Sequence, residues 1–172
     1  MGSLARYFRP DRHYETIAAI DLRGLWANGF RGLILDLDNT LVPWRSAEIP
    51  PDVAAWAKKA TAMGFALCIA SNTRIYTRLA EVAEALGATY VTGVTKPRRD
   101  GFRRAVQKMG LQQEQVAVIG DQLLTDILGA RRLGLHAILV DRISDREFIV
   151  TRFNRCVERI IARLVAPITR HP

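Results

Sequence analysis

The feature that most constrains the fold is a regular alternation of short apolar runs with amphipathic helical stretches. The apolar runs indicate buried strands and lie at 32–37, 65–70, 88–91, 116–119 and 136–140. The helical stretches that separate them lie near 52–63, 75–86, 100–109 and 126–133. Strands that alternate with helices are joined by crossover connections, which produce a parallel sheet covered by helices on its faces. The sequence thus predicts an α/β protein with a parallel five-stranded sheet flanked by helices.

Glycines mark the ends of the helical stretches. A glycine follows each of four such stretches, at Gly64, Gly87, Gly110 and Gly134. Glycine is favoured there because it can take the left-handed conformation that closes a helix. No repeat, linker or low-complexity segment interrupts the 172 residues. A single domain over residues 1–172 is therefore expected, with residues 1–30 as an N-terminal helical extension because 13–28 carry a weak helical signal.

The chain carries a formal net charge of +8. Such a charge suggests an acidic partner: nucleic acid, anionic lipid or a phosphorylated substrate. A soluble basic protein without a polyanionic partner is the alternative. Residues 147–165 predict a basic amphipathic helix, with Arg152, Arg155, Arg159 and Arg163 beside an apolar face. This helix could lie on an anionic membrane, or it could pack on the sheet with its arginines solvated.

The location is expected to be cytoplasmic, with any membrane contact peripheral. No stretch approaches the roughly 20 apolar residues of a membrane span. The N-terminus, MGSLARYFRP, lacks the apolar core of a signal peptide. The two cysteines, Cys68 and Cys156, suggest neither a disulfide framework nor a metal cluster.

Two acids, Asp36 and Asp38, stand at the end of the first apolar run, GLILDL. Burying a carboxylate is costly unless it is paired, hydrogen-bonded or bound to a metal. Alternate residues of a strand point to the same side, so both acids are expected on one face at the strand's end. Their repulsion would raise the pKa of one of them or favour a divalent cation between them. The alternative is a simple turn at Asp38-Asn39-Thr40.

Other polar residues follow the later strands, at the edge where parallel sheets bind ligands. They are Ser71 and Asn72, Lys96, and Asp121. With the two acids of the first strand, Asp121 could complete a site for Mg²⁺, which prefers a few carboxylates with water and phosphate. Structural alternatives exist for the rest. Ser71, Asn72 and Thr73 could cap a helix, Lys96 could be an ordinary surface lysine, and Thr125 and Asp126 could cap the following helix.

These stretches carry a resemblance to a known family. In order, DLDNT, SN, KP and GDQLLTD are similar to the four motifs of the haloacid dehalogenase (HAD) superfamily of phosphohydrolases. Over almost the whole chain the sequence also resembles the YqeG-type family of HAD-IIIA phosphatases. The stretches concerned are GLILDLDNTLVPW, KPRRDGFRRAV, VIGDQLLTDILGARRLG and FIVTRFNR. The resemblance implies a single Rossmann-like HAD domain and phosphatidylglycerophosphate phosphatase activity.

The resemblance also implies a role for each motif residue. Asp36 would be the nucleophile that forms an aspartyl-phosphate, and Asp38 the general acid and base. Mg²⁺ would be bound by Asp36, the backbone carbonyl of Asp38 and Asp121, with Asp126 as a further metal-site candidate.

The transferring phosphate would be held by three residues, Ser71, Asn72 and Lys96. Of these, Ser71 and Lys96 would also take part in catalysis, since they would stabilise the charge that spreads over the phosphate oxygens.

The motif spacing predicts an uncapped site. Asp38 and Ser71 are 33 positions apart and Ser71 and Lys96 are 25 apart, which a crossover helix and its loops nearly fill. An open site suits a substrate too large to enclose, such as an anionic phospholipid headgroup at a membrane surface. Two other functions remain open. One is a HAD phosphatase for a soluble phosphorylated metabolite or protein. The other is a non-catalytic basic adaptor that binds nucleic acid, although such an adaptor would be expected to have eroded motifs.

Overall fold

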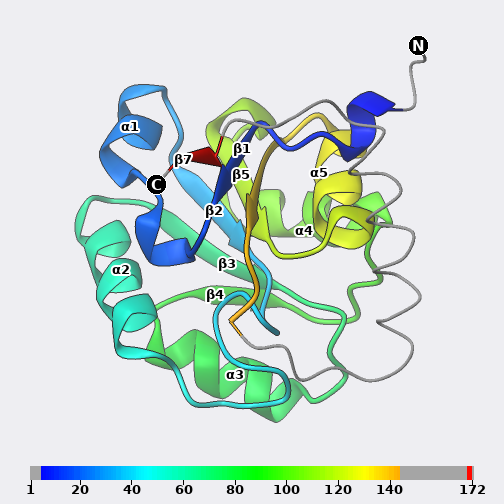
Figure 1. The fold of residues 1–172 in the computed structure, drawn as a ribbon. Coiled ribbons are helices and arrows are strands. Elements are labelled where there is room, and N and C mark those ends of the chain that lie inside the picture. The colour runs from blue at the N-terminus through cyan, green and yellow to red at the C-terminus, as the bar shows by residue number, and fades with distance from the viewer. Residues whose placement is uncertain (1–4, 144–169, 172) are drawn as a thin grey trace.

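The computed structural model describes residues 5–143 and 170–171. The predicted helix at 147–165 and Cys156 lie outside the described residues. The described chain forms one parallel sheet in the order β4-β3-β2-β5-β6-β1-β7 (Figure 1). Its strands are β1 (Arg12–Tyr14), β2 (Gly32–Leu35), β3 (Ala66–Ala70), β4 (Thr89–Val91), β5 (Val116–Gly120), β6 (His136–Val140) and β7 (Arg170–His171).

The five predicted strands are confirmed as β2 to β6. The sheet continues beyond β6 with β1 and β7, so the predicted number of strands was too low. The expectation that residues 1–30 form a helical extension is therefore wrong in part, because β1 belongs to the sheet. A three-residue strand, Arg12–Tyr14, is too short to show a periodicity of two. The strand β2 ends at Leu35, so Asp36 and Asp38 lie just beyond it.

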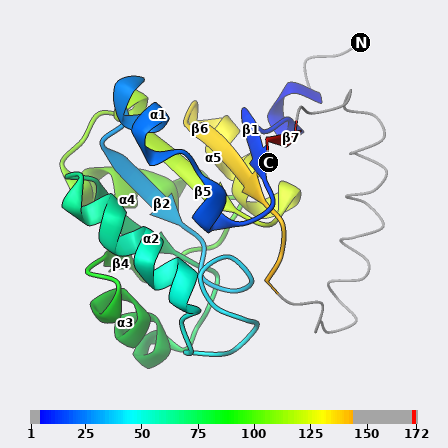
Figure 2. The same ribbon diagram turned by 60° about the vertical axis from the view of Figure 1, so that its left-hand side comes forward.

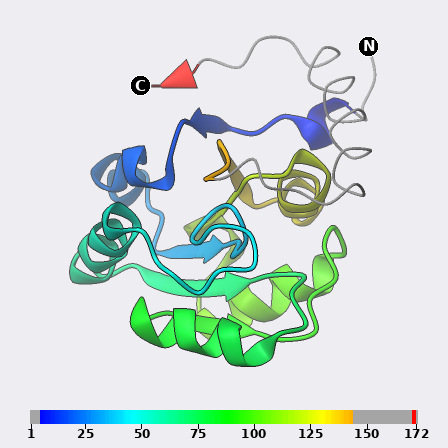
Figure 3. The same cartoon turned by 60° about the horizontal axis from the view of Figure 1, so that its bottom comes forward.

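Helices cover both faces of the sheet. They are α1 (Leu22–Ala27), α2 (Pro51–Ala62), α3 (Tyr76–Ala85), α4 (Arg99–Met109) and α5 (Leu128–Leu133). Short turns of other helix types are η1 (Ala5–Phe8), η2 (Ile17–Ala19), η3 (Gln113–Gln115) and η4 (Leu123–Ile127). The first three helices lie on one face and the last two on the other (Figures 2 and 3).

The strand sequences explain this arrangement. Successive residues of a strand point to opposite faces, so Leu33 and Leu35 join the core under α1 to α3 while Ile34 joins the core under α4 and α5. Both faces of β2 are buried, which is why its sequence is a continuous apolar run. Two helix ends confirm the glycine caps: Gly110 and Gly134 close α4 and α5 at φ 67° and 79°.

The carboxyl edge of the sheet holds a topological switch point. From β2 the chain adds β3 and β4 on one side, then returns to place β5 on the other side of β2. The loops after β2 and β5 therefore diverge, which opens a crevice at this edge. One helix, α2, is all the regular structure between β2 and β3, and α3 is all that lies between β3 and β4. Within the described residues, these short connections contain no inserted cap domain, as the motif spacing predicts.

The described residues include no helix that has both the length and the apolar character required to cross a bilayer.

Candidate active site

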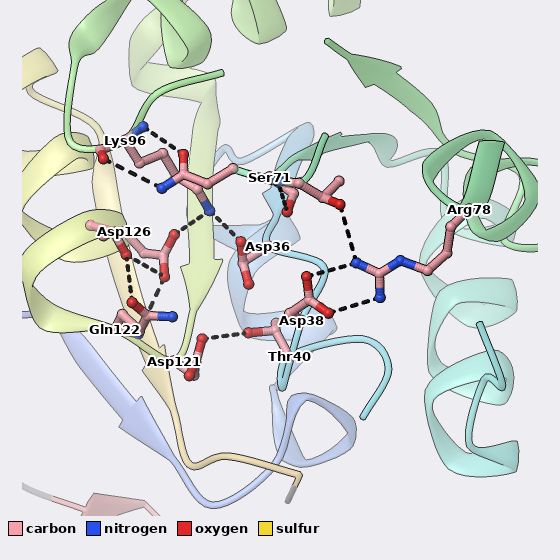
Figure 4. A network of polar contacts seen from close by, with 12 residues as sticks. Asp36, Asp38, Thr40, Ser71, Arg78, Lys96, Asp121, Gln122 and Asp126 are labelled. Carbon is pink, nitrogen blue, oxygen red and sulfur yellow. Dashed lines mark hydrogen bonds and ion pairs between the residues drawn. The ribbon is translucent and has the colours of Figure 1, made fainter. Parts of the chain in front are cut away.

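A cavity of about 440 Å³ opens at the switch point. The loops after β2, β3, β4 and β5 all contribute to it, which brings together residues far apart in the sequence. Five of the predicted site residues line its wall: Asp36, Asp38, Ser71, Asn72 and Lys96. The others, Asp121 and Asp126, belong to the same polar network (Figure 4).

Lys96 lies at the centre of this network. Its Nζ donates to Asp36 Oδ1 and, at 2.5 Å, to Asp126 Oδ1. Burial alone would lower the pKa of Lys96, but the two carboxylates outweigh burial, with Asp126 the stronger, and the pKa is raised. Lys96 is therefore a buried permanent cation, and the alternative that it is an ordinary surface lysine is wrong.

The pKa of Asp36 is raised to about 7. Burial is the largest cause, Lys96 opposes it, and Asp126 adds to it. Asp38 is the smallest of these causes, so the expected repulsion between neighbouring acids contributes less than the removal of Asp36 from water. The backbone supports this position, since Asp36 N donates to Ile119 O of β5 at 2.9 Å.

Three buried carboxyl groups could hold a metal ion. Oxygen atoms of Asp36, Asp121 and Asp126 all lie within 4.8 Å of one another. Burial and the charges of Asp36 and Asp126 raise the pKa of Asp121 well above its usual value. A cluster of hard oxygen donors that repel one another fits a small divalent cation. The carboxylate of Asp38 is not a member of this group, which leaves its backbone carbonyl as the ligand that the family resemblance implies.

Gly120 makes room for Asp126. A Cβ added to Gly120 would lie 2.3 Å from Asp126 Cγ, which is a severe overlap. Asp126 is also held by Gln122, whose backbone N donates to Asp126 Oδ2 at 3.2 Å. Glycine is therefore required at the first position of GDQLLTD, because a larger side chain would overlap Asp126. Asp126 lies inside η4 and not at its start, so the alternative that it only caps a helix is wrong.

Asp38 has a partner that the sequence did not suggest. Arg78 of α3 donates to both carboxylate oxygens of Asp38, each at 2.8 Å. Arg78 also donates to Ser46 O at 3.0 Å and is itself buried. A signal was present: Arg78 and Val82 are four residues apart in a helix and share its buried face. A charged residue on an apolar helix face needs a buried partner.

Ser71 and Asn72 do not cap a helix, because α3 begins only at Tyr76. Ser71 Oγ accepts from Thr73 N at 3.2 Å, and Ser71 is a buried residue of the cavity wall. Asn72 instead holds the chain at Lys96: its Oδ1 accepts from Lys96 N at 2.7 Å and its Nδ2 donates to Lys96 O at 3.4 Å. The observed contacts of Asn72 therefore position Lys96, whereas the sequence predicted that it binds phosphate.

Comparisons with known proteins agree with this geometry. A family model described as a haloacid dehalogenase-like hydrolase matches residues 44–134. The "probable phosphatase YqeG" of Bacillus subtilis is 39% identical over 92% of this chain and 91% of its own. The "phosphatidylglycerophosphate phosphatase 1, chloroplastic" of Chlamydomonas reinhardtii is 29% identical over 90% of this chain, which spans 61% of that protein.

A solved structure, a HAD phosphatase from Thermococcus onnurineus, shows the same fold. Its TM-score is 0.50 at 23% identity, over 59% of this chain and 51% of that one. The family match covers just over half of the 172 residues, and the Bacillus relative covers nearly all of them. The chain therefore belongs to the YqeG-type family of haloacid dehalogenase-like phosphatases.

Proposed function

We propose that this phosphatase hydrolyses phosphomonoesters with the help of Mg²⁺ through an aspartyl-phosphate on Asp36, and that its substrate is phosphatidylglycerophosphate. The observation that carries the chemistry is the environment of Asp36. It lines a cavity, is bonded to a buried lysine and lies next to two further carboxyl groups. A carboxylate so placed can attack phosphorus as a nucleophile.

In the first step, a carboxylate oxygen of Asp36 forms a bond to phosphorus while the ester bond breaks, and the alcohol leaves with a proton from Asp38. In the second step, water attacks the phosphorus of the aspartyl-phosphate and gives its proton to Asp38. The acyl-phosphate bond breaks, which releases inorganic phosphate and restores Asp36. Asp38 Oδ1 accepts from both Arg78 and Arg45 N, whereas Oδ2 accepts from Arg78 and keeps a second lone pair, which could take the transferred proton.

Positive charge is needed because a carboxylate attacks a phosphate dianion. Lys96 supplies a permanent cation within reach of Asp36. Ser71 lines the cavity, and its hydroxyl would donate to a phosphate oxygen. A Mg²⁺ ion held by Asp36, Asp121, Asp126 and the carbonyl of Asp38 would supply further charge to neutralise the carboxylates and the phosphate together.

The substrate proposal has different support. Two relatives at 29% and 27% identity are named phosphatidylglycerophosphate phosphatases. In the described part of the chain, the short connections after β2 and β3 place no cap domain over the cavity, which suits a headgroup that stays attached to a membrane. The rival substrates are soluble phosphomonoesters, which the same four loops would process by the same chemistry.

The test is phosphate release by the full chain with and without Mg²⁺. The substrates are phosphatidylglycerophosphate in mixed micelles and a panel of soluble phosphomonoesters, with Asp36→Asn as the matched inactive variant. We expect lipid turnover that needs Mg²⁺ and is absent in Asp36→Asn. Turnover of soluble esters alone would reject the lipid substrate, and no turnover by a folded, Mg²⁺-loaded protein would reject the proposal as a whole.

A further inference from the structure

Two adjacent apolar side chains, Ile75 and Tyr76, are exposed beside the cavity. Within the described part of the chain, the large apolar side chains that are exposed are Ile75 (51%), Tyr76 (45%) and Ile143 (39%). Ile75 and Tyr76 follow β3, and Ile143 follows β6, so all three lie at the carboxyl edge of the sheet. Ile75 is part of the wall of this cavity, whereas Ile143 lines a different pocket. Single exposed apolar residues are common on protein surfaces, but Ile75 and Tyr76 are an exposed pair next to a polar cavity.

The fold does not account for Ile75 and Tyr76. They occupy the N-cap and the first position of α3, and Ile75 provides no capping hydrogen bond. Serine, threonine, aspartate or asparagine would cap this helix and would be stable in water. An isoleucine there neither caps the helix nor buries its side chain. Its place at the cavity mouth therefore points to a partner outside the folded chain.

Two exposed arginines flank these apolar residues. Arg45 and Arg74 both line the cavity. Arg45 has a left-handed backbone at φ 58°, and its backbone N donates to Asp38 Oδ1 at 2.9 Å, so this loop is held against the site. Arg45, Arg74, Ile75 and Tyr76 together form what we call the cavity rim. It combines cations with apolar side chains on a chain of net charge +8.

We propose that the cavity rim docks on the surface of an anionic lipid bilayer. Ile75 and Tyr76 enter the headgroup region, and Arg45 and Arg74 pair with lipid phosphates. Tyrosine suits this boundary because its ring is apolar and its hydroxyl polar. The inference rests on the proposed function, because docking serves to present the headgroup phosphate to Asp36 while the acyl chains stay in the bilayer.

A bilayer fits this surface better than a protein partner. A stable protein interface buries about 800 Å² per partner around an apolar core, which two adjacent side chains cannot supply. Membrane attachment needs less, because a few inserted side chains act together with attraction between arginines and anionic lipids. Within residues 5–143, the short connections between strands also insert no domain over the cavity.

The test is sedimentation of the full chain with vesicles that contain no substrate, made of phosphatidylcholine with or without phosphatidylglycerol. The rim variants are Arg74→Ala and the double variant Ile75→Ser, Tyr76→Ser. Arg23→Ala is the matched control, because Arg23 is exposed on α1, which ends shortly before the amino end of β2. We expect wild-type binding to phosphatidylglycerol vesicles, about fivefold weaker binding for Arg74→Ala, a loss of tenfold or more for the double variant, and no change for Arg23→Ala.

A second readout locates the rim directly. Tyr76→Trp and Arg23→Trp each add one tryptophan, and brominated lipids quench a tryptophan that enters the bilayer. Quenching above the wild-type level is expected for Tyr76→Trp only, and thermal melting shows whether each variant is folded.

Two results overturn the docking proposal. One is a wild-type chain that does not bind phosphatidylglycerol vesicles. The other is rim variants that bind like the wild type, as they would if a segment elsewhere in the chain made the contact. Failure of the proposed function is distinct, because the vesicles hold no substrate. If binding depends on the rim but no lipid is hydrolysed, the proposed substrate is rejected and the docking is retained. If lipid is hydrolysed but the rim variants behave like the wild type, the docking is rejected and the substrate is retained.

Discussion

At the scale of single residues, Asp38 depends on Arg78. Two bonds of 2.8 Å join them in a site where both side chains are largely buried. Replacing Arg78 with alanine would leave a buried carboxylate without its main partner, which costs roughly 3–5 kcal/mol in comparable cases. We therefore expect Arg78→Ala to lower the free energy of unfolding by that order and to reduce turnover on the order of 10²-fold, because Asp38 loses its position as general acid and base.

Urea denaturation and steady-state kinetics measure these two effects separately. Arg78→Lys is the matched variant, since it keeps the charge and loses the two-point geometry, and it should fall between wild type and Arg78→Ala. Wild-type turnover in Arg78→Ala would contradict a role for this pair in catalysis.

At the scale of elements, the packing of α4 against α5 supports the loops of the site. Phe102 of α4 is fully buried, and a Cβ at Gly129 of α5 would lie 2.4 Å from its ring. The ring therefore fills the space that the glycine leaves. Phe102→Ala should lower the free energy of unfolding by about 3–5 kcal/mol, through lost burial and the cavity left behind.

Urea denaturation provides the measurement. Arg103→Ala, at the exposed neighbouring position, should stay within about 0.5 kcal/mol of wild type. A Phe102→Ala protein as stable as Arg103→Ala would show that α4 and α5 do not depend on this contact.

At the scale of the whole molecule, the acid cluster links metal binding to stability. The pKa values of Asp36 and Asp121 are raised chiefly by burial and further by neighbouring carboxylates, with Asp126 acting on both, so a cation that relieves this repulsion should favour the folded chain. At Mg²⁺ concentrations a hundredfold above Kd the gain is about 2.7 kcal/mol, or several degrees in Tm for a chain of this size. Asp121→Asn should remove the Mg²⁺-dependent rise in Tm without lowering Tm in chelator. A full rise in Asp121→Asn would exclude this carboxylate as a ligand.

The dependence of stability on pH should include a contribution from His136 of β6. Burial is the main cause that lowers its pKa, although Asp11 opposes it, with His136 Nδ1 3.5 Å from Asp11 Oδ2. The folded state therefore favours the neutral ring. Its contribution to stability is complete above the unfolded pKa of about 6.5 and is lost as pH falls through the lower folded value.

His136→Gln, which has no charge to gain, should lose less stability than wild type between pH 7 and pH 5, because about half of unfolded histidine side chains already bind a proton at pH 6.5. The difference between the two chains isolates His136 from the buried acids, whose raised pKa values act in the opposite sense. Parallel curves for the two proteins would exclude the effect.

The family and most of the site could be predicted because their signals are local. Each strand, helix and glycine cap is encoded within about a dozen residues, and parallel strands bring their carboxyl ends to one edge. That topology placed Asp36, Asp38, Ser71 and Lys96 around one cavity without knowledge of any distance. The strand β1 was missed because three residues carry no periodicity, and its pairing with β6 joins segments more than a hundred residues apart.

By itself, the sequence determined the α/β class, the order of the chemical groups and the edge on which they meet, since these follow from periodicity and from the rules of parallel sheets. Only the tertiary structure decided which groups pair. Asn72 binds the backbone of Lys96, Arg78 binds Asp38, and burial is the largest cause of the raised pKa of Asp36. The physical reason is that hydrogen bonds and desolvation depend on distances of a few ångströms between residues far apart in the chain, which no local pattern encodes.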